Sequence, residues 1–187
     1  MSVHDYSIKV GGEAGQGINT IGSILSRSFA AQGFHLFGHQ DYYSRVRGGH
    51  NFYQVRTATF PIYSFSDNLE VLVALDQASL DLHTDELVPD GVIIYDQNIQ
   101  AEIKNPNTLA LPMAELGKEH GGKAVMGNTV AAGAVWQVMG GEAGILENVL
   151  AKLFQEKGSD LVRANIKAAR AGADYAINTI LAGVPVS

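Results

Sequence analysis

Residues 6–17 read YSIKVGGEAGQG, a short β-type run that ends in a glycine-rich segment. The sequence that follows repeats apolar side chains on one helical face at three- to four-residue spacing, namely Ile18, Ile21, Leu25 and Phe29. Gly33 is expected to end this helix as a C-cap. The opening of the chain therefore predicts a strand, a glycine loop and a helix, which is the basic unit of an α/β fold.

The remaining sequence predicts strands that alternate with helices. Continuous apolar runs at 70–76 and 91–96 are typical of strands buried on both faces. The run at 51–57 alternates instead, and 59–64 follows closely enough to pair with it antiparallel, with Pro61 marking an edge. Further strands are predicted at 34–37 and 108–111, and helices at 77–87, 113–120 and from 125 onward, with breaks near 140–141 and 158. Together they predict one three-layer α/β/α domain over residues 1–187, whose largely parallel sheet carries an antiparallel edge portion.

Composition limits the classes of function that the chain can serve. With 46% apolar and 17% charged residues it can bury a core, and its formal net charge of −6 argues against nucleic-acid or anionic-membrane partners. There is no cysteine, so cysteine-ligated iron–sulfur clusters must belong to another chain. The sequence lacks a basic start followed by an apolar run and lacks a membrane-length apolar stretch, so a cytoplasmic location is expected.

The glycine loop is the first candidate binding site. A glycine backbone lets a ligand come close, and the N-terminus of the helix that begins near Ile18 favours phosphate or carboxylate. Gly12, Gly15, Gln16 and Gly17 are therefore candidate ligand-binding residues. The loop lacks the Gly-Lys-Ser/Thr ending of a Walker sequence and the spacing of a dinucleotide fingerprint. The alternative is that its glycines only allow a tight strand-to-helix crossover.

A second candidate site lies in the polar loop predicted from 39 to 50. There Arg45, Arg47, Gly48 and Gly49 combine two planar guanidinium donors with a backbone that an anion can approach. Both loops follow β-type segments, so they are predicted to form one anion site at the carboxyl ends of the strands. The alternative is that one arginine ties loops together through main-chain carbonyls. His50 is a candidate proton shuttle, but a hydrogen-bonded structural role is commoner for such a histidine.

Two segments in this order and spacing carry a family resemblance. GGEAGQG at 11–17 and YYSRVRGGHN at 42–51 resemble the signatures of the gamma domain of pyruvate and 2-oxoglutarate ferredoxin oxidoreductases and of the related indolepyruvate enzyme. The helix start at 127–133 also matches and adds Asn128 to the candidate binding residues. Ala14 departs from the family, in which many members have glycine there. RGGHN at 47–51 is more similar to gamma domains that are fused ahead of an alpha domain.

The resemblance implies a thiamine-diphosphate enzyme that decarboxylates a 2-oxoacid such as pyruvate or 2-oxoglutarate, passes electrons to ferredoxin and releases an acyl-CoA. It implies that this chain helps to bind coenzyme A, carries no catalytic or metal-binding residue, and is inactive without alpha and beta subunits. A delta or ferredoxin-like subunit is a further partner to test. Thiamine diphosphate, magnesium and the iron–sulfur clusters are implied to lie in the partner subunits. No Gly-Asp-Gly segment with a downstream asparagine, the usual magnesium diphosphate pattern, is present here.

Two other classes of function stay open. A free-standing module that binds a flavin or nicotinamide nucleotide would use the same glycine loop, and the absorbance of the protein would reveal a flavin. A purely structural subunit would make no ligand contacts, and titration with coenzyme A would distinguish it from the first interpretation.

Overall fold

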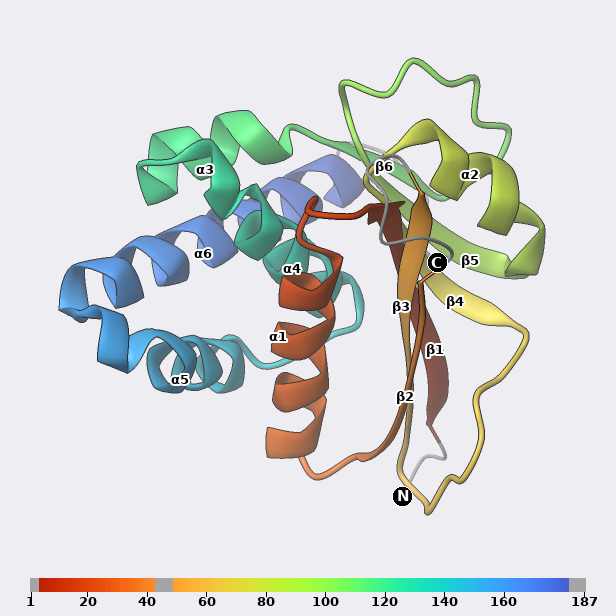
Figure 1. Cartoon of the computed structure of the whole chain (residues 1–187), viewed down its shortest axis with the longest axis horizontal. Coiled ribbons are helices and arrows are strands. Elements are labelled where there is room, and N and C mark those ends of the chain that lie inside the picture. The colour runs from red at the N-terminus through yellow and green to blue at the C-terminus, as the bar shows by residue number, and fades with distance from the viewer. Residues whose placement is uncertain (1–3, 43–48, 182–187) are drawn as a thin grey trace.

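The sheet of this protein is parallel on one side of its central strand and antiparallel on the other (Figure 1). The computed structural model describes residues 4–42 and 49–181. In these residues the strand order is β2-β3-β1-β4-β5-β6. The strands are β1 (Asp5–Glu13), β2 (His35–Tyr42), β3 (His50–Ala58), β4 (Leu69–Ala74), β5 (Leu87–Asp96) and β6 (Thr108–Leu111).

Strand pairing confirms the fold class that the sequence predicts. β1 pairs in parallel with β4, β4 with β5, and β5 with β6. β3 runs antiparallel to both β1 and β2, so the antiparallel portion forms one edge of the sheet. The carboxyl ends of the parallel strands therefore meet at the same edge as the amino end of β3.

Helices cover the two faces of the sheet unequally. Figure 1 shows α1 and α3–α6 on one side and α2 on the other. The helices are α1 (Ile18–Ala31), α2 (Gln77–His83), α3 (Met113–Gly121), α4 (Gly127–Val138), α5 (Ala143–Phe154) and α6 (Ser159–Leu181). Short 3-10 helices, η1 (Thr84–Glu86), η2 (Ala124–Met126) and η3 (Gln155–Lys157), follow α2, α3 and α5.

The main core lies between the sheet and the larger helical layer. Along β1, Ile8 and Val10 are buried against this layer and belong to the same apolar cluster as Phe29 of α1 and Trp136 of α4. A smaller cluster of Ala74, Leu80 and Ile93 lies apart from it. The large core fixes the position of α1, and with it the glycine loop that precedes this helix.

α4 packs directly against the backbone of α6. A Cβ atom at Gly133 would lie 2.0 Å from the carbonyl oxygen of Ala169, and one at Gly172 would lie 2.0 Å from the carbonyl oxygen of Val130. Glycine at these two positions therefore allows a close helix crossing that any side chain would prevent. This crossing holds the start of α4 beside the loop between β1 and α1.

The predicted strand at 59–64 is wrong. These residues are irregular, because both edges of β3 are already paired, with β1 and β2, and offer no place for another strand. The predicted polar loop from 39 is also too long, since β2 continues to Tyr42 and pairs with β3 as far as Asn51. β1 likewise extends to Glu13, so the glycine loop itself spans only residues 14–17.

The predicted helix at 77–87 is shorter than expected. α2 ends at His83, η1 follows, and β5 already begins at Leu87 rather than at 91. The remaining predicted strands and helices occur at the expected places, including the breaks near 140–141 and 158. The C-cap residue of α1 is Gln32, and Gly33 follows it with a φ of 92°, so the predicted glycine stop lies one residue beyond the cap.

Candidate functional site

The glycine loop closes on itself through hydrogen bonds between Glu13 and Gln16. The backbone N–H of Gln16 donates to the carbonyl oxygen of Glu13 (3.1 Å), and the N–H of Glu13 donates to the side-chain Oε1 of Gln16 (2.7 Å). Gly15 and Gly17 adopt φ values of 96° and 93°, a region that L residues rarely enter. The loop is therefore a fixed turn that needs glycine at these two positions.

The N-terminus of α1 is open at this turn. The carbonyl oxygen of Gly17 accepts hydrogen bonds from the N–H groups of Thr20 (2.9 Å) and Ile21 (3.1 Å). The N-cap residue is Gly17, which has no side chain that could accept a hydrogen bond from the first N–H groups of the helix. The partial positive charge of the helix end is therefore presented to whatever occupies the space beside the loop.

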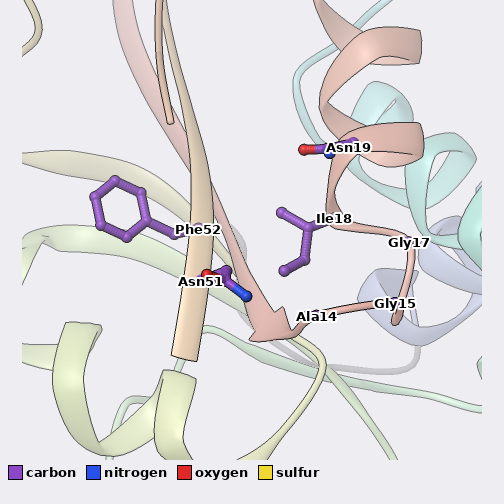
Figure 2. A pocket seen from close by; sticks show the side chains of 7 residues that line it. All are labelled: Ala14, Gly15, Gly17, Ile18, Asn19, Asn51 and Phe52. Atoms are coloured by element: carbon purple, nitrogen blue, oxygen red, sulfur yellow. The ribbon is translucent and has the colours of Figure 1, made fainter. Parts of the chain in front are cut away.

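A cavity of about 290 Å³ lies beside this helix end (Figure 2). Its lining residues are Ala14, Gly15, Gly17, Ile18, Asn19, Asn51 and Phe52. Figure 2 shows Asn51 on the side of β3 that faces the loop, whereas the Phe52 ring points to the other side of the strand. The cavity thus combines backbone groups of the glycine loop with the start of β3.

Asn51 is a buried polar residue in the wall of this cavity. The residue is 3% exposed, and its side-chain Nδ2 donates to the carbonyl oxygen of Gly49 (3.2 Å). Its Oδ1 has no donor in the part of the chain that the structure describes. Because buried polar atoms are normally hydrogen-bonded, a small shift of this amide on binding would give a ligand N–H or O–H a ready acceptor.

Asn128, at the start of α4, packs over the glycine loop. A Cβ atom at Gly17 would lie 1.9 Å from its Nδ2, so the amide of Asn128 fills the space above the glycine. Asn128 and Gln16 also line a second cavity of about 160 Å³ on the side of α3 and α4. The loop is therefore held between β3 and α4, with a cavity on either side.

The opposite face of the sheet carries a partly buried ionic cluster. Lys9 of β1 forms an ion pair with Glu86, and its Nζ lies 4.5 Å from the centroid of the Phe52 ring. Nδ1 of His83 contacts Oε1 of Glu86 (2.8 Å), and Nε2 of His83 contacts Nε2 of His50 (2.8 Å). The cluster joins β1, β3, α2 and η1.

Burial and hydrogen bonds together set the charge state of this cluster. Burial lowers the pKa of His50 and of His83, because a charged imidazole loses hydration there. Burial raises the pKa of Glu86, but hydrogen bonds from Lys9 and His83 outweigh it, so the net pKa is lowered. Glu86 is then ionised and both imidazoles neutral near pH 7. His50 is hydrogen-bonded to His83 in this cluster, which fits the structural role that the sequence favours.

Sequence comparison gives the family of the chain. The profile of the pyruvate ferredoxin/flavodoxin oxidoreductases matches residues 7–175. This chain belongs to the pyruvate ferredoxin/flavodoxin oxidoreductase family. It is similar to subunit VorA of the ketoisovalerate oxidoreductase of Methanothermobacter marburgensis, with 31% identity over 92% of this chain and 37% of the relative. It is also similar to subunit alpha of a 2-oxoacid:ferredoxin oxidoreductase of Saccharolobus solfataricus, with 28% identity over 49% of this chain and 14% of the relative.

The chain therefore spans less than half the length of these curated relatives. Among solved structures, it matches a 2-oxoglutarate:ferredoxin oxidoreductase from Magnetococcus marinus with 2-oxoglutarate, coenzyme A and succinyl-CoA bound. That match has a TM-score of 0.83 and 25% identity, over 93% of this chain and 31% of the other. The gamma subunit of a keto/oxoacid ferredoxin oxidoreductase from Geobacter sulfurreducens has the same fold, with a TM-score of 0.80, 23% identity, and coverage of 94% and 98%.

The predicted binding residues of this oxidoreductase family member lie in different places: some line a cavity, and others lie within a strand or outside the described residues. Gly15 and Gly17 line the cavity beside α1, whereas Gln16 and Asn128 line the neighbouring one. Gly12 lies within β1, where a Cβ atom would meet Gln16 and Leu75. These positions make Gln16 and Gly12 elements that shape the loop, and a ligand contact by either stays a prediction.

The predicted polar loop that contains Arg45 and Arg47 falls largely outside the described residues. Arg45, Arg47 and Gly48 lie in the undescribed segment 43–48, so their part in the predicted anion site stays a prediction. Gly49 is described, and its carbonyl oxygen accepts a hydrogen bond from the side chain of Asn51. Asn51 was not among the predicted binding residues, although the β alternation of 51–57 places it on the same face as Tyr53, which packs against Gly22 of α1.

Two further features concern metals and membranes. Among residues 4–42 and 49–181, no group of three or more histidine, cysteine, aspartate or glutamate side chains is placed to hold a metal ion. In the same ranges, every helix is too short or too polar to cross a lipid bilayer.

Proposed function

We propose that this chain is the gamma subunit, or the gamma domain of a longer chain, of a 2-oxoacid:ferredoxin oxidoreductase. That enzyme oxidatively decarboxylates a 2-oxoacid to an acyl-CoA. In this proposal the chain contributes part of the coenzyme A site and packs against alpha and beta subunits in the cytoplasm. Family membership supports the assignment, and a 25% identical structure with coenzyme A and succinyl-CoA bound supports coenzyme A as the ligand.

The cavity at the open N-terminus of α1 carries the proposal. All of its lining residues are uncharged, so no lining carboxylate repels a phosphate, and the helix end attracts one. Glu13, the nearest acidic residue in the sequence, is exposed and does not line the cavity. We assign the phosphate-bearing part of coenzyme A to this cavity, with Asn51 as an acceptor for an N–H or O–H of the same ligand.

Thiamine diphosphate, magnesium and the iron–sulfur clusters belong to partner subunits in this proposal. The chain has no cysteine to ligate a cluster. It is therefore expected to show no 2-oxoacid oxidation alone and to gain it when the partner subunits are added, with ferredoxin as the electron acceptor of the complex.

A matched pair of substitutions at Ala14 tests the binding site. Ala14 is exposed and lines the cavity, so Ala14→Asp adds one negative charge, while Ala14→Asn adds nearly the same volume without it. Like charges about 8 Å apart repel by about 2 kcal/mol at an effective dielectric constant of about 20. The affinity for coenzyme A, measured by calorimetry, is expected to fall about thirtyfold in Ala14→Asp and much less in Ala14→Asn.

Equal affinities in the two variants would contradict the glycine-loop site and favour the purely structural subunit. A flavin or nicotinamide nucleotide that binds with charge-sensitive affinity, while coenzyme A does not bind, would favour the nucleotide-binding module instead.

A further inference from the structure

A cavity of about 260 Å³ opens between the starts of α4 and α6. None of its lining residues belongs to the polar loop predicted from 39 to 50. Side chains from six elements line it, among them Thr20, Lys123, Val125, Asn128, Phe154 and Lys157. Asn128 also lines the cavity beside Gln16, so the two cavities are neighbours. This arrangement is built by the close packing of α4 and α6 and does not depend on one surface loop.

Two lysines line this cavity and no acidic residue does. Lys123 lies just before η2 and Lys157 at the end of η3, and neither forms an ion pair with any residue in 4–42 or 49–181. The polar cavity on the other face of the sheet is different, because there Lys9 is paired with Glu86 and two further aspartates line the walls. In a chain of net charge −6, the lysine-lined cavity is thus suited to an anion.

Neutral polar groups complete the floor and wall. Thr129 Oγ1 donates to Oδ1 of Asn165 (2.7 Å), whose Nδ2 donates to the carbonyl oxygen of Leu161 (2.9 Å). These groups satisfy one another and hold α4 to α6. The side chains of Thr20 and Asn128 form no hydrogen bond within the described part of the chain, so a hydroxyl and an amide remain as donors to a ligand.

Apolar side chains form part of the cavity wall. Val125, which is 66% exposed, and Phe154, which is partly buried, both line this cavity. The Nζ of Lys157 lies 5.8 Å from the centroid of the Phe154 ring. The ligand that suits these walls has a phosphate next to a flat, weakly polar group, which is the chemistry of a nucleotide.

We propose that this cavity binds a nucleotide phosphate, with Lys123 and Lys157 on the phosphate and the base against Val125 and Phe154. The inference goes beyond the proposed function, because it names a second site that does not require the cavity beside Gly17. The same chemistry has two sources: the 3′-phosphate and adenine of coenzyme A, with its diphosphate left to the cavity beside Gly17, or a separate nucleotide.

Adenosine 3′,5′-bisphosphate is the probe, titrated by calorimetry into the full chain and into Lys123→Gln and Lys157→Gln. Lys152→Gln is the matched control, because Lys152 is exposed on α5 and does not line the cavity. Each lysine of the cavity is expected to contribute about tenfold to affinity through a charge-assisted contact. The control is expected to bind as the unchanged chain does.

Coenzyme A and 3′-dephospho-coenzyme A distinguish the two sources. If the site holds the end of coenzyme A, the two lysine variants weaken coenzyme A about tenfold and leave the dephospho compound unaffected. If it holds a separate nucleotide, they weaken the bisphosphate alone. A bisphosphate that fails to bind, or binds all three variants equally, overturns the proposal. Ala14→Asp reports on the glycine loop separately, so an unaltered coenzyme A affinity in that variant would reject only the proposed function.

Discussion

Replacing Gly17 by alanine should show that Asn128 lies over the glycine loop. Gly15 and Gly17 have nearly equal φ values, 96° and 93°, so alanine at either position carries about the same strain, about 1–2 kcal/mol. A Cβ atom at Gly15 meets nothing within 4 Å, whereas at Gly17 it would lie 1.9 Å from Nδ2 of Asn128. Asn128 must then leave its rotamer, which costs about another 1 kcal/mol.

Gly17→Ala is thus expected to lower the free energy of unfolding by about 1 kcal/mol more than Gly15→Ala. The entropy that alanine removes from the unfolded chain is the same in both variants and cancels. Urea unfolding, followed by the fluorescence of the buried Trp136, measures the difference. In an Asn128→Ala background the two glycine substitutions should cost the same. Equal costs without that background, or a difference that persists within it, would refute the contact.

Three further predictions concern pH, helix packing and cofactor content. Because burial lowers the pKa of His50 and His83, the unfolded chain binds more protons below about pH 6.5, so the free energy of unfolding should fall from pH 7 to pH 5, and His83→Gln should flatten that slope. Gly133→Ala should cost about 3 kcal/mol or prevent folding, because its Cβ would meet the carbonyl oxygen of Ala169 at 2.0 Å, whereas Gly144→Ala on α5 meets only Glu142 at 3.7 Å and should be neutral or stabilising by thermal unfolding. The chain alone should contain neither iron nor acid-labile sulfide on chemical analysis, because it has no cysteine, and a brown protein with stoichiometric iron would contradict this.

Local signals were sufficient to predict the first unit of the fold. The β-type residues before Gly11, the glycines that follow, and the periodic helix from Ile18 agree on one strand, loop and helix, and the structure confirms all three. The apolar runs at 70–76 and 91–96 similarly predicted parallel strands, because burial on both faces leaves no polar alternation. In each case the residues that determine the element lie next to one another in the chain.

Features that depend on distant residues were not predictable. Lys9 sits in a run that looks like an ordinary strand, and only the fold brings Glu86 and His83 to it. The contact of Asn128 with Gly17 likewise joins α4 to the first loop, and the family resemblance names both residues without indicating that they touch. The error at 59–64 has the same origin, because the sequence does not reveal that β2 takes the free edge of β3.

Hydrogen exchange of the backbone amides tests the central claim most directly, because it reports on the glycine loop without any substitution. The protein is incubated in deuterated buffer with and without saturating coenzyme A, and exchange is followed at residues 14–19. If coenzyme A occupies the cavity at the start of α1, exchange is expected to slow at Gly15, Gly17 and Ile18. Exchange is expected to stay unchanged in the part of α5 that lines neither this cavity nor the one with Lys123 and Lys157. Bound coenzyme A with unaltered exchange at residues 14–19 would contradict the account and place the ligand elsewhere.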